Sequence, residues 1–229
     1  MLKQNEFVRY ATGHLGLSHA LLERVGGQTA AAARQLRGFS PAIIEERPMH
    51  MVQLDVFSRL MMDRIIFLGV PIDDYVANVI QAQLLFLDSV DPKREISLYI
   101  NSPGGAVIAG LGIYDTMQFI RPEVHTICTS MAASMGAVLL ASGTKGKRSC
   151  LPHSRIMIHQ TSGGAQGQLT DMEITYKLFK SLQSELYEIL SKHTGQPLEN
   201  INRDCDRDHW MKADEALQYG LVDEVLEKA

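Results

Sequence analysis

The sequence predicts an α/β fold in which βα units stack around a parallel sheet. Short apolar runs of strand length alternate with longer segments in which apolar residues recur at helical spacing, and turn residues lie between them. This alternation is typical of parallel strands joined by right-handed helical crossovers. The chain has 229 residues, of which 45% are apolar and 21% are charged, proportions typical of one soluble globular domain.

Each element is predicted from its own local signals. An apolar run that ends in Gly69 indicates the first strand, and Asp73 or Asp74 caps the helix that follows and stops before Pro92. The expected strands are 65–69, 96–100, 124–128, 155–159 and 221–226, and the expected helices are 74–91, 106–120, 135–142, 170–194, a short helix from Pro197, and 213–219. Turns are expected at 101–105 and, as a bend of small residues, at 130–133.

The later third of the chain differs from the stacked units. Residues 161–169 contain three glycines and little that fills a core, so we expect this segment to project. A capping box, Thr170-x-x-Glu173, then opens a helix of more than twenty residues that ends near Gly195. A helix this long after a glycine-rich arm favours contact with a second subunit.

Residues 1–37 have a different composition from the rest. They carry five basic residues against two acidic ones and lack the apolar core of a secretory signal. We interpret them as a leader that is removed as a pro-segment, with a plain N-terminal helix as the alternative. Residues 38–229 then form a single domain.

Composition also limits the function. A formal charge of -4 means that the chain lacks the excess of basic residues that is typical of proteins that bind nucleic acid. Three cysteines without CxxC spacing support neither a zinc site nor a disulfide framework, which favours a reducing compartment. The most apolar stretch, 131–141, is far shorter than the roughly 20 residues that span a bilayer.

Two features follow predicted strands, at the edge where open parallel sheets place their sites. The glycine turn at 102–105 presents backbone N–H groups that can hold an oxyanion. Ser134 begins a predicted helix among small residues, where a nucleophile is accessible and the Met135 N–H lies near developing negative charge. The alternatives are an ordinary glycine turn and an ordinary N-cap serine.

A serine nucleophile needs a base and an orienting carboxylate. His159 directly follows a predicted strand and is the best placed of eight histidines. The carboxylate candidates are Asp204, Asp206, Asp208 and Asp171, and their spacing alone does not choose among them.

From residue 43 to 225 the chain resembles the proteolytic subunits of the caseinolytic (Clp) proteases, the ClpP family. The motifs that carry the resemblance are Ser-Arg-Leu at 58–60 and the segments 63–68, 99–105, 132–137, 157–160 and 220–223. The resemblance implies a crotonase-like fold of stacked ββα units with a projecting handle strand and long helix. It also implies an ATP-dependent serine endopeptidase that assembles as two stacked heptameric rings around a closed chamber.

The resemblance also assigns site residues. It implies a triad of Ser134, His159 and Asp208, with the N–H groups of Gly105 and Met135 as oxyanion donors. Residues 163–169 and the helix from Thr170 correspond to the handle that joins the rings, where Asp206 and Arg207 pair across the contact.

The implied partner is a hexameric AAA+ unfoldase such as ClpX or ClpA/ClpC, which delivers unfolded polypeptides. The unfoldase uses the ATP, so no cofactor or metal is expected in this chain, and no nucleic acid or membrane partner. The expected docking pocket consists of Leu85, Tyr99, Phe119, Ile127, Leu151 and Leu226. The implied location is the bacterial cytoplasm, with an organelle matrix as the alternative.

Four positions depart from the family pattern. Ser97, Thr129 and Ser149 stand where members have larger apolar or aromatic groups in the docking pocket, and Thr161 replaces a common proline after the His-Gln pair. Three rival functions remain at this stage. They are a crotonase-like acyl-CoA hydratase or hydrolase, a serine–lysine peptidase with Lys145 or Lys147 as base, and a catalytically silent ring subunit.

Overall fold

The computed structural model describes residues 42–47, 50–164 and 166–227. The chain divides into two units, residues 1–59 and 60–229, which are described separately. The expected leader, residues 1–37, lies outside the described residues.

The first unit contains an antiparallel hairpin that sequence analysis did not predict. Strand β1 (Ala42–Arg47) pairs with β2 (His50–Asp55), with Ala42 opposite Asp55 and Arg47 opposite His50. Helix α3 (Val56–Met62) follows, and the Asp55 carboxylate accepts hydrogen bonds from the backbone N–H groups of Phe57 and Ser58. A side-chain cap of this kind satisfies N–H groups that the first turn leaves free.

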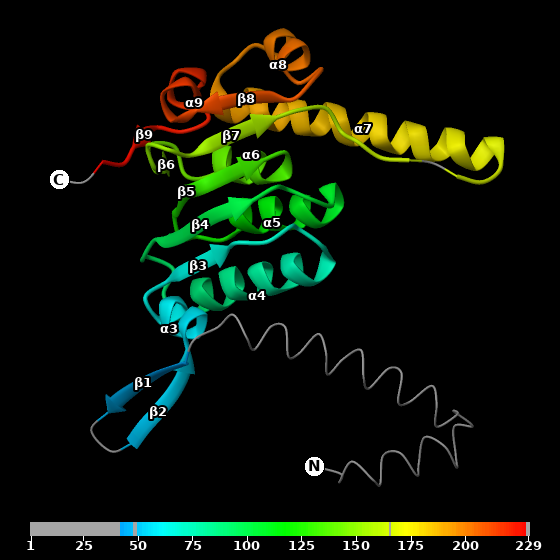
Figure 1. Cartoon of the computed structure of the whole chain (residues 1–229). Coiled ribbons are helices and arrows are strands. Elements are labelled where there is room, and N and C mark those ends of the chain that lie inside the picture. Colours follow the sequence, from blue (N-terminus) through cyan, green and yellow to red (C-terminus); the bar gives the residue numbers. More distant parts are fainter. Residues whose placement is uncertain (1–41, 48–49, 165, 228–229) are drawn as a thin grey trace, which may run out of the picture. The chain divides into compact units, whose positions relative to one another are not determined.

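The second unit is built on a seven-stranded sheet in the described residues (Figure 1). Its strands are β3 (Ile65–Leu68), β4 (Ile96–Ser102), β5 (Val124–Ala133), β6 (Arg148–Cys150), β7 (Arg155–Ile158), β8 (His209–Lys212) and β9 (Glu224–Val225). The order is β3-β4-β5-β6-β9, and β7 pairs with both β5 and β8. All pairs are parallel except β7–β8, which is antiparallel, so the predicted α/β class with a parallel sheet is confirmed for most of the sheet.

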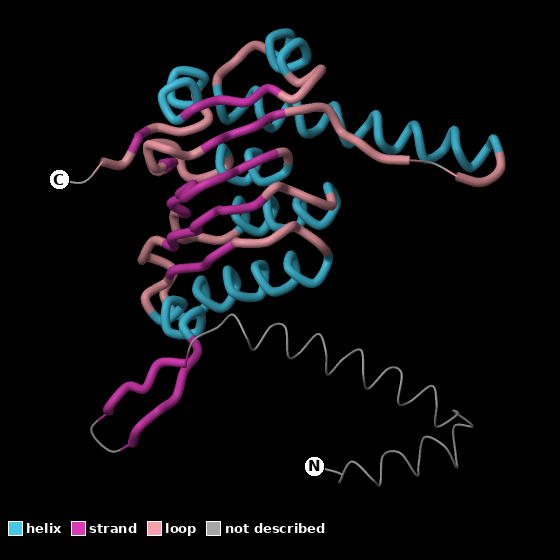
Figure 2. Tube along the Cα trace, viewed as in Figure 1, coloured by secondary structure: helices cyan, strands magenta, loops and turns pink. Residues whose placement is uncertain are grey.

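The helices that follow β3 are α4 (Asp74–Val90), α5 (Val107–Phe119), α6 (Met135–Ala141), α7 (Leu169–Thr194), α8 (Leu198–Asp204) and α9 (Ala213–Tyr219). Helices α4, α5 and α6 cover one face of the sheet, and α7 extends beyond it (Figure 1). Helices α4, α5 and α6 each follow one strand and pack side by side. The loop between β7 and α7 runs out along α7, so the glycine-rich arm projects together with the long helix, as predicted (Figure 2).

Strand β4 shows how the sequence sets this layering. Ile96, Leu98 and Ile100 are fully buried, whereas the alternate residues Ser97 and Tyr99 are half-buried. Because successive side chains in a strand point to opposite faces, one face of the sheet lies under the helices and the other is partly open.

Two predicted boundaries are wrong. Strand β5 does not end at Cys128 and bend at 130–133; it continues to Ala133. It changes neighbour along its length, pairing with β6 over residues 126–128 and with β7 over 131–133, so both ends of the strand have backbone partners on this side. The closing strand expected at 221–226 is reduced to Glu224–Val225, where pairing with β6 occurs.

The start of α7 also differs from the prediction. The helix begins at Leu169 with Gln168 as N-cap and no side-chain capping bond, so Thr170 and Glu173 do not form a capping box. This end of the helix is exposed, and water can satisfy its free N–H groups. The C-terminal end agrees with the sequence, because Gly195 takes the left-handed conformation there, with φ of 79°.

Candidate active site

Ser134 lies at the sharp turn between β5 and α6. Its φ of 55° and ψ of -123° fall in a region that L-residues seldom occupy. The turn is held by a 2.8 Å hydrogen bond from the Ser134 N–H to the Met157 carbonyl of β7. Small neighbours are required here, since a Cβ added to Gly136 would lie 3.0 Å from the Ser102 carbonyl oxygen. The strained turn presents the serine hydroxyl at the carboxyl edge of the sheet.

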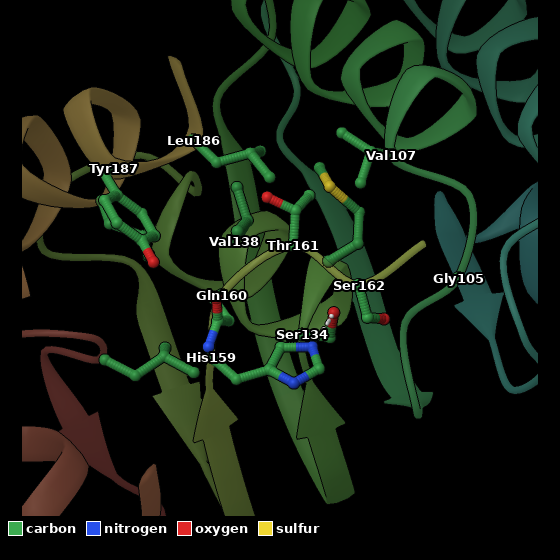
Figure 3. A pocket seen from close by; sticks show the side chains of 13 residues that line it. Gly105, Val107, Ser134, Val138, His159, Gln160, Thr161, Ser162, Leu186 and Tyr187 are labelled. Carbon is green, nitrogen blue, oxygen red and sulfur yellow. Dashed lines mark hydrogen bonds between the residues drawn. The ribbon is translucent and has the colours of Figure 1, made fainter. Parts of the chain in front are cut away.

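His159 follows the end of β7 and connects Ser134 to Asp208. Its Nε2 lies 2.8 Å from Ser134 Oγ, and its Nδ1 lies 3.1 Å from Asp208 Oδ1. Figure 3 shows the imidazole beside Ser134 at the entrance of a pocket. The two ring nitrogens therefore face the nucleophile and the carboxylate, which is the arrangement of a Ser–His–Asp triad.

The geometry distinguishes the four candidate aspartates. Asp204 is held away from His159 by Arg203, at 2.9 Å, and by the Tyr219 hydroxyl, which donates to it at 3.0 Å. Asp206 has an exposed carboxylate, and Asp171 lies in the first turn of α7. Asp208 is the one of the four that contacts His159.

The glycine turn after β4 packs directly against the Ser134 turn. A Cβ on Gly104 would lie 2.8 Å from Ser134 Cβ and 2.9 Å from the Met135 nitrogen. Gly105 has φ of 150°, and a Cβ there would lie 2.1 Å from the Ile72 carbonyl oxygen. Only glycine can follow this path. Gly105 and Met135, which the family resemblance implies as oxyanion donors, line the same pocket as Ser134.

A pocket of about 50 Å³ opens next to the serine, and we call it the Ser134 pocket. It is lined by Gly105, Val107, Ser134, Met135, Val138, Ile158, His159, Gln160, Thr161, Ser162, Leu186, Tyr187 and Leu190 (Figure 3). Sequence analysis did not assign Leu186, Tyr187 or Leu190 to the site. The sequence shows only that α7 has a periodic apolar face. That periodicity does not indicate which cavity the face lines.

The loop that carries Asp208 is tied to the residue next to His159. Gln160 Nε2 donates to the Asp206 carbonyl at 2.6 Å. The neighbouring pair, Arg207 and Asp206, has Nε and Oδ2 4.0 Å apart within the chain, and both side chains are exposed.

The expected docking residues occupy different environments. Leu85 and Phe119 are exposed, Leu151 is partly exposed, and Tyr99 stacks on Phe67 with ring centroids 6.4 Å apart. Leu226 is half-buried, and Ile127 is buried. Of the departures, Ser97 and Thr129 are half-buried, whereas Ser149 is buried and its Oγ lies 2.9 Å from His125 Nε2.

Two rivals lose support from the geometry. Lys147 contacts Glu95 at 2.6 Å and Glu123 at 2.7 Å, and these carboxylates raise the pKa of Lys147 to about 12, so it does not serve as the base for Ser134. Lys145 is exposed and does not line the Ser134 pocket. A hydratase needs acid and base carboxylates at the substrate, and none of the described residues that line the pocket carries one.

The described residues contain no group of three or more side chains placed to hold a metal ion. The cysteines Cys128, Cys150 and Cys205 are free and buried, and burial raises the pKa of Cys150 to about 11 and that of Cys205 to about 12. Such thiols are poor nucleophiles at neutral pH. In the described part of the chain, no helix combines the length and apolar character needed to cross a membrane.

An α/β fold that brings serine, histidine and aspartate into this order defines a serine hydrolase. A family model described as Clp protease matches residues 48–229, so the chain belongs to the Clp protease family. It is 59% identical over 224 residues to an ATP-dependent Clp protease proteolytic subunit of Porphyromonas gingivalis, covering 98% of both chains. Proteins of the same name from two strains of Bacteroides fragilis are 59% identical over 224 residues, covering 98% of this chain and 99% of the relative, and 65% identical over 189 residues, covering 82% and 91%.

Proposed function

We propose that this chain is the proteolytic subunit of an ATP-dependent Clp protease and hydrolyses unfolded polypeptides to short peptides as a serine endopeptidase. The observation that carries the proposal is the continuous contact from Ser134 Oγ through His159 to Asp208. Family membership and the full-length similarity to proteins named as Clp proteolytic subunits support the same activity.

In the acylation step, Ser134 Oγ attacks the peptide carbonyl while His159 Nε2 takes the hydroxyl proton. Negative charge on the carbonyl oxygen is stabilised by the N–H groups of Gly105 and Met135. The tetrahedral intermediate then expels the amine, which receives its proton from His159. Asp208 holds the Nδ1–H tautomer of the imidazole and stabilises its charged form.

In the second step, His159 removes a proton from water, and the hydroxyl attacks the acyl-enzyme ester. The bond from the carbonyl carbon to Ser134 Oγ then breaks, His159 returns its proton to Ser134 Oγ, and the peptide leaves as a carboxylic acid that ionises in water. In each half-reaction His159 takes one proton and gives one proton up, so the enzyme needs no cofactor for the chemistry.

Ser134→Ala tests this assignment. We expect loss of peptidase activity on the order of 10³-fold or more, together with loss of labelling by a serine-directed phosphonate. Ser130→Ala, at an exposed position of the same strand, is the matched control. Substantial peptide hydrolysis by Ser134→Ala would reject Ser134 as the nucleophile.

The same pair of variants tests the leader. We propose that residues 1–37 are a pro-segment that the assembled enzyme removes, because the composition changes there. Mass spectrometry of the purified chains should find wild type and Ser130→Ala shortened and Ser134→Ala at full length. Equal trimming in all three would assign the cut to another protease.

We further propose that the chain assembles as two stacked heptameric rings and works with a hexameric AAA+ unfoldase, such as ClpX or ClpA/ClpC, which consumes the ATP. The first half of α7 supports assembly, because Ile174, Tyr176 and Leu178 are exposed there in a single chain. Asp206 and Arg207 are proposed to pair across the ring contact. Native mass spectrometry gives the subunit number directly, and a monomer at working concentration would contradict the proposal.

For location we propose the bacterial cytoplasm. The relatives named above come from bacteria, and the three cysteines of this chain are unpaired. Free thiols persist in reducing compartments. Fractionation of cells that express the protein tests this proposal.

A further inference from the structure

Ser102 is a fully buried serine at the carboxyl end of β4, directly before the glycine turn. Its Oγ donates to the Val70 carbonyl at 2.7 Å and accepts from the Gly104 N–H at 3.2 Å. Pro103 lies between the two residues and has no N–H, so the Gly104 N–H is the first backbone donor of the turn. The proton of this hydroxyl and one of its lone pairs are therefore both in use.

The loop that accepts from Ser102 runs parallel to the glycine turn. The Ile72 N–H donates to the Gly104 carbonyl at 2.8 Å, and the Ala106 N–H donates to the Ile72 carbonyl at 2.8 Å. These bonds make Ile72 and Gly105 a parallel bridge pair, in which Ile72 uses its own N–H and carbonyl. The Gly105 N–H therefore points away from the loop, and within the described residues it donates to no protein group.

The glycine turn also packs against the nucleophile. Ser102 is in register with Ala132 of β5, two residues before Ser134, so the two turns leave the sheet from neighbouring positions. They are in close contact, because a Cβ on Gly104 would lie 2.8 Å from Ser134 Cβ. The place of the Gly105 N–H relative to Ser134 thus depends on how the glycine turn leaves β4.

We propose that Ser102 is a positioning residue for the oxyanion hole, because its hydroxyl fixes the start of the glycine turn and so sets the place of the Gly105 N–H. The inference rests on the proposed peptidase function and adds a residue to it. Ser102 is fully buried and does not line the Ser134 pocket, so it acts on the reaction through the backbone. A misplaced backbone donor stabilises less of the negative charge that develops in the transition state.

Ser102→Ala tests the proposal. The change leaves the Val70 carbonyl and the buried Gly104 N–H without their partner and releases the start of the turn. We expect kcat for a peptide substrate to fall by about ten-fold or more. KM should stay within about three-fold, because the negative charge is present in the transition state and not in the bound substrate.

Ser154→Ala is the matched control. Ser154 is also fully buried, and its Oγ donates to the Cys128 carbonyl of β5 at 2.9 Å. The control removes the same atom and the same kind of bond at a position outside the glycine turn, so it measures what the loss of a buried hydroxyl does to the fold. With assembly verified by native mass spectrometry, we expect kcat of Ser154→Ala within about three-fold of wild type.

A second measurement reports on the oxyanion hole itself. It compares a peptide ester with the matching thionoester, in which sulfur replaces the carbonyl oxygen. Sulfur is the weaker hydrogen-bond acceptor, so correctly placed donors favour the oxygen ester. We expect Ser102→Ala to lower the oxygen-to-sulfur ratio of kcat/KM by about ten-fold and Ser154→Ala to leave it unchanged. Ser102→Cys, whose thiol is a weak donor and acceptor, should give an intermediate ratio.

The outcomes separate this inference from the proposed function. A wild-type ratio in Ser102→Ala would overturn the proposal even if kcat falls, because a general loss of structure lowers both rates alike. If Ser102→Ala does not assemble, Ser102→Cys decides, and a wild-type ratio there also overturns the proposal. In both cases hydrolysis that still depends on Ser134 leaves the peptidase assignment intact. If Ser134→Ala hydrolyses both esters as wild type does, the proposed function itself is wrong.

Discussion

At the scale of single residues, the site depends on a backbone strain at Ser134. A positive φ at a residue with a side chain costs on the order of 1 kcal/mol. The neighbouring structure holds this conformation through the Ser134 N–H bond to Met157 and through the close approach of Gly104. In return, the hydroxyl stands 2.8 Å from His159 Nε2 in the uncomplexed chain. The reacting groups are therefore placed before substrate binds.

Asp208→Asn tests the orienting role of the carboxylate. An amide that donates to His159 Nδ1 favours the tautomer with its proton on Nε2, which cannot accept the proton of Ser134. We expect kcat for a peptide substrate to fall on the order of 10³-fold or more, with assembly retained by native mass spectrometry. Asp171→Asn, at another of the candidate aspartates, should retain activity within a few-fold. Activity within ten-fold of wild type for Asp208→Asn would assign the orienting role elsewhere.

Sequence pattern was sufficient for some of these residues and insufficient for others. Ser134 and His159 each come after a strand. The apolar pattern of that strand is enough to predict that they lie at the carboxyl edge of a parallel sheet. Choosing Asp208 over Asp204 required a contact that spans fifteen residues, because the hydroxyl of Tyr219 in α9 draws Asp204 away. Spacing contains no information on such a contact, and only family resemblance selected Asp208 in advance.

At the scale of elements, the junction between α4 and β4 depends on one buried cation. Arg64 is 3% exposed and has a left-handed backbone, with φ of 66°. Its guanidinium donates to four backbone carbonyls, those of Leu87, Asp91, Arg94 and Glu95. These carbonyls come from the last turn of α4 and the turn into β4. Arg64 therefore supplies donors to carbonyls that the end of α4 and the following turn leave free.

Arg64→Ala should be one of the most destabilising single changes in the molecule. It leaves several carbonyls without a donor in a buried position, at a cost of about 3 kcal/mol in the free energy of unfolding. Urea unfolding at fixed protein concentration measures the change. Arg94→Ala, at an exposed neighbour, should change the same quantity by about 0.5 kcal/mol or less. A loss below about 1 kcal/mol for Arg64→Ala would show that water replaces the guanidinium.

The end of α7 contains a buried histidine that makes stability depend on pH. Burial, with the nearby charges of Lys192 and Arg148, lowers the pKa of His193 to about 4. Its Nε2 lies 3.3 Å from the Tyr114 hydroxyl of α5. Because the folded pKa is below the unfolded value of about 6.5, the unfolded chain binds the proton more strongly. The stabilising contribution is complete above pH 6.5 and is lost as the pH falls toward 4.

His193→Gln removes this titration. Between pH 7 and pH 5, wild type should lose on the order of 1 kcal/mol more stability than His193→Gln. Urea unfolding at both values, referenced to His153→Gln at an exposed histidine, isolates the contribution. Identical pH dependence in wild type and His193→Gln would mean that His193 is accessible to protons without unfolding.

The elements that sequence analysis missed are those whose burial depends on distant partners. Strand β6 contains Arg148 and Ser149. Their polar side chains are typical of a loop, yet both residues are buried. The carboxylate of Asp223 pairs with Arg148, and His125 contacts Ser149. By contrast, β3, α4 and α9 agree with the predicted ranges to within one residue or two, because their local pattern and their burial coincide.

At the scale of the whole molecule, a single chain leaves large apolar side chains uncovered on α4, α5 and α7. Phe119 is 80% exposed and Ile174 is 62% exposed. Exposure of this extent marks surfaces that bind other chains. The catalytic residues lie at one edge of the sheet, and the projecting arm begins two residues after His159, so the arm and the catalytic histidine belong to one continuous segment.

The surface proposed to dock the unfoldase includes polar residues at positions where the family resemblance leads us to expect apolar ones. On the partly open face of the sheet, Ser97 of β4 pairs in register with His125 of β5, and His125 contacts Ser149 of β6. The histidine therefore lies between the two serines on this face of the sheet. Tyr99 lies on β4 and Leu151 directly follows β6, and both keep apolar character.

We expect this mixed surface to bind its own unfoldase well and a foreign one poorly. An apolar docking loop that meets Ser97 and His125 loses burial worth about 1.5–3 kcal/mol for each missing aromatic contact. ATP-dependent degradation of a tagged folded substrate, with cognate and heterologous unfoldases at equal low concentrations, measures the difference. Ser97→Tyr should raise the heterologous rate, because Ser97 is only half-buried and a larger side chain there can reach the surface. Ser149→Phe should not, because Ser149 is 2% exposed and bonded to His125, so a larger group there strains the sheet. Equal rates with both unfoldases for the wild-type enzyme would show that the polar residues do not affect docking.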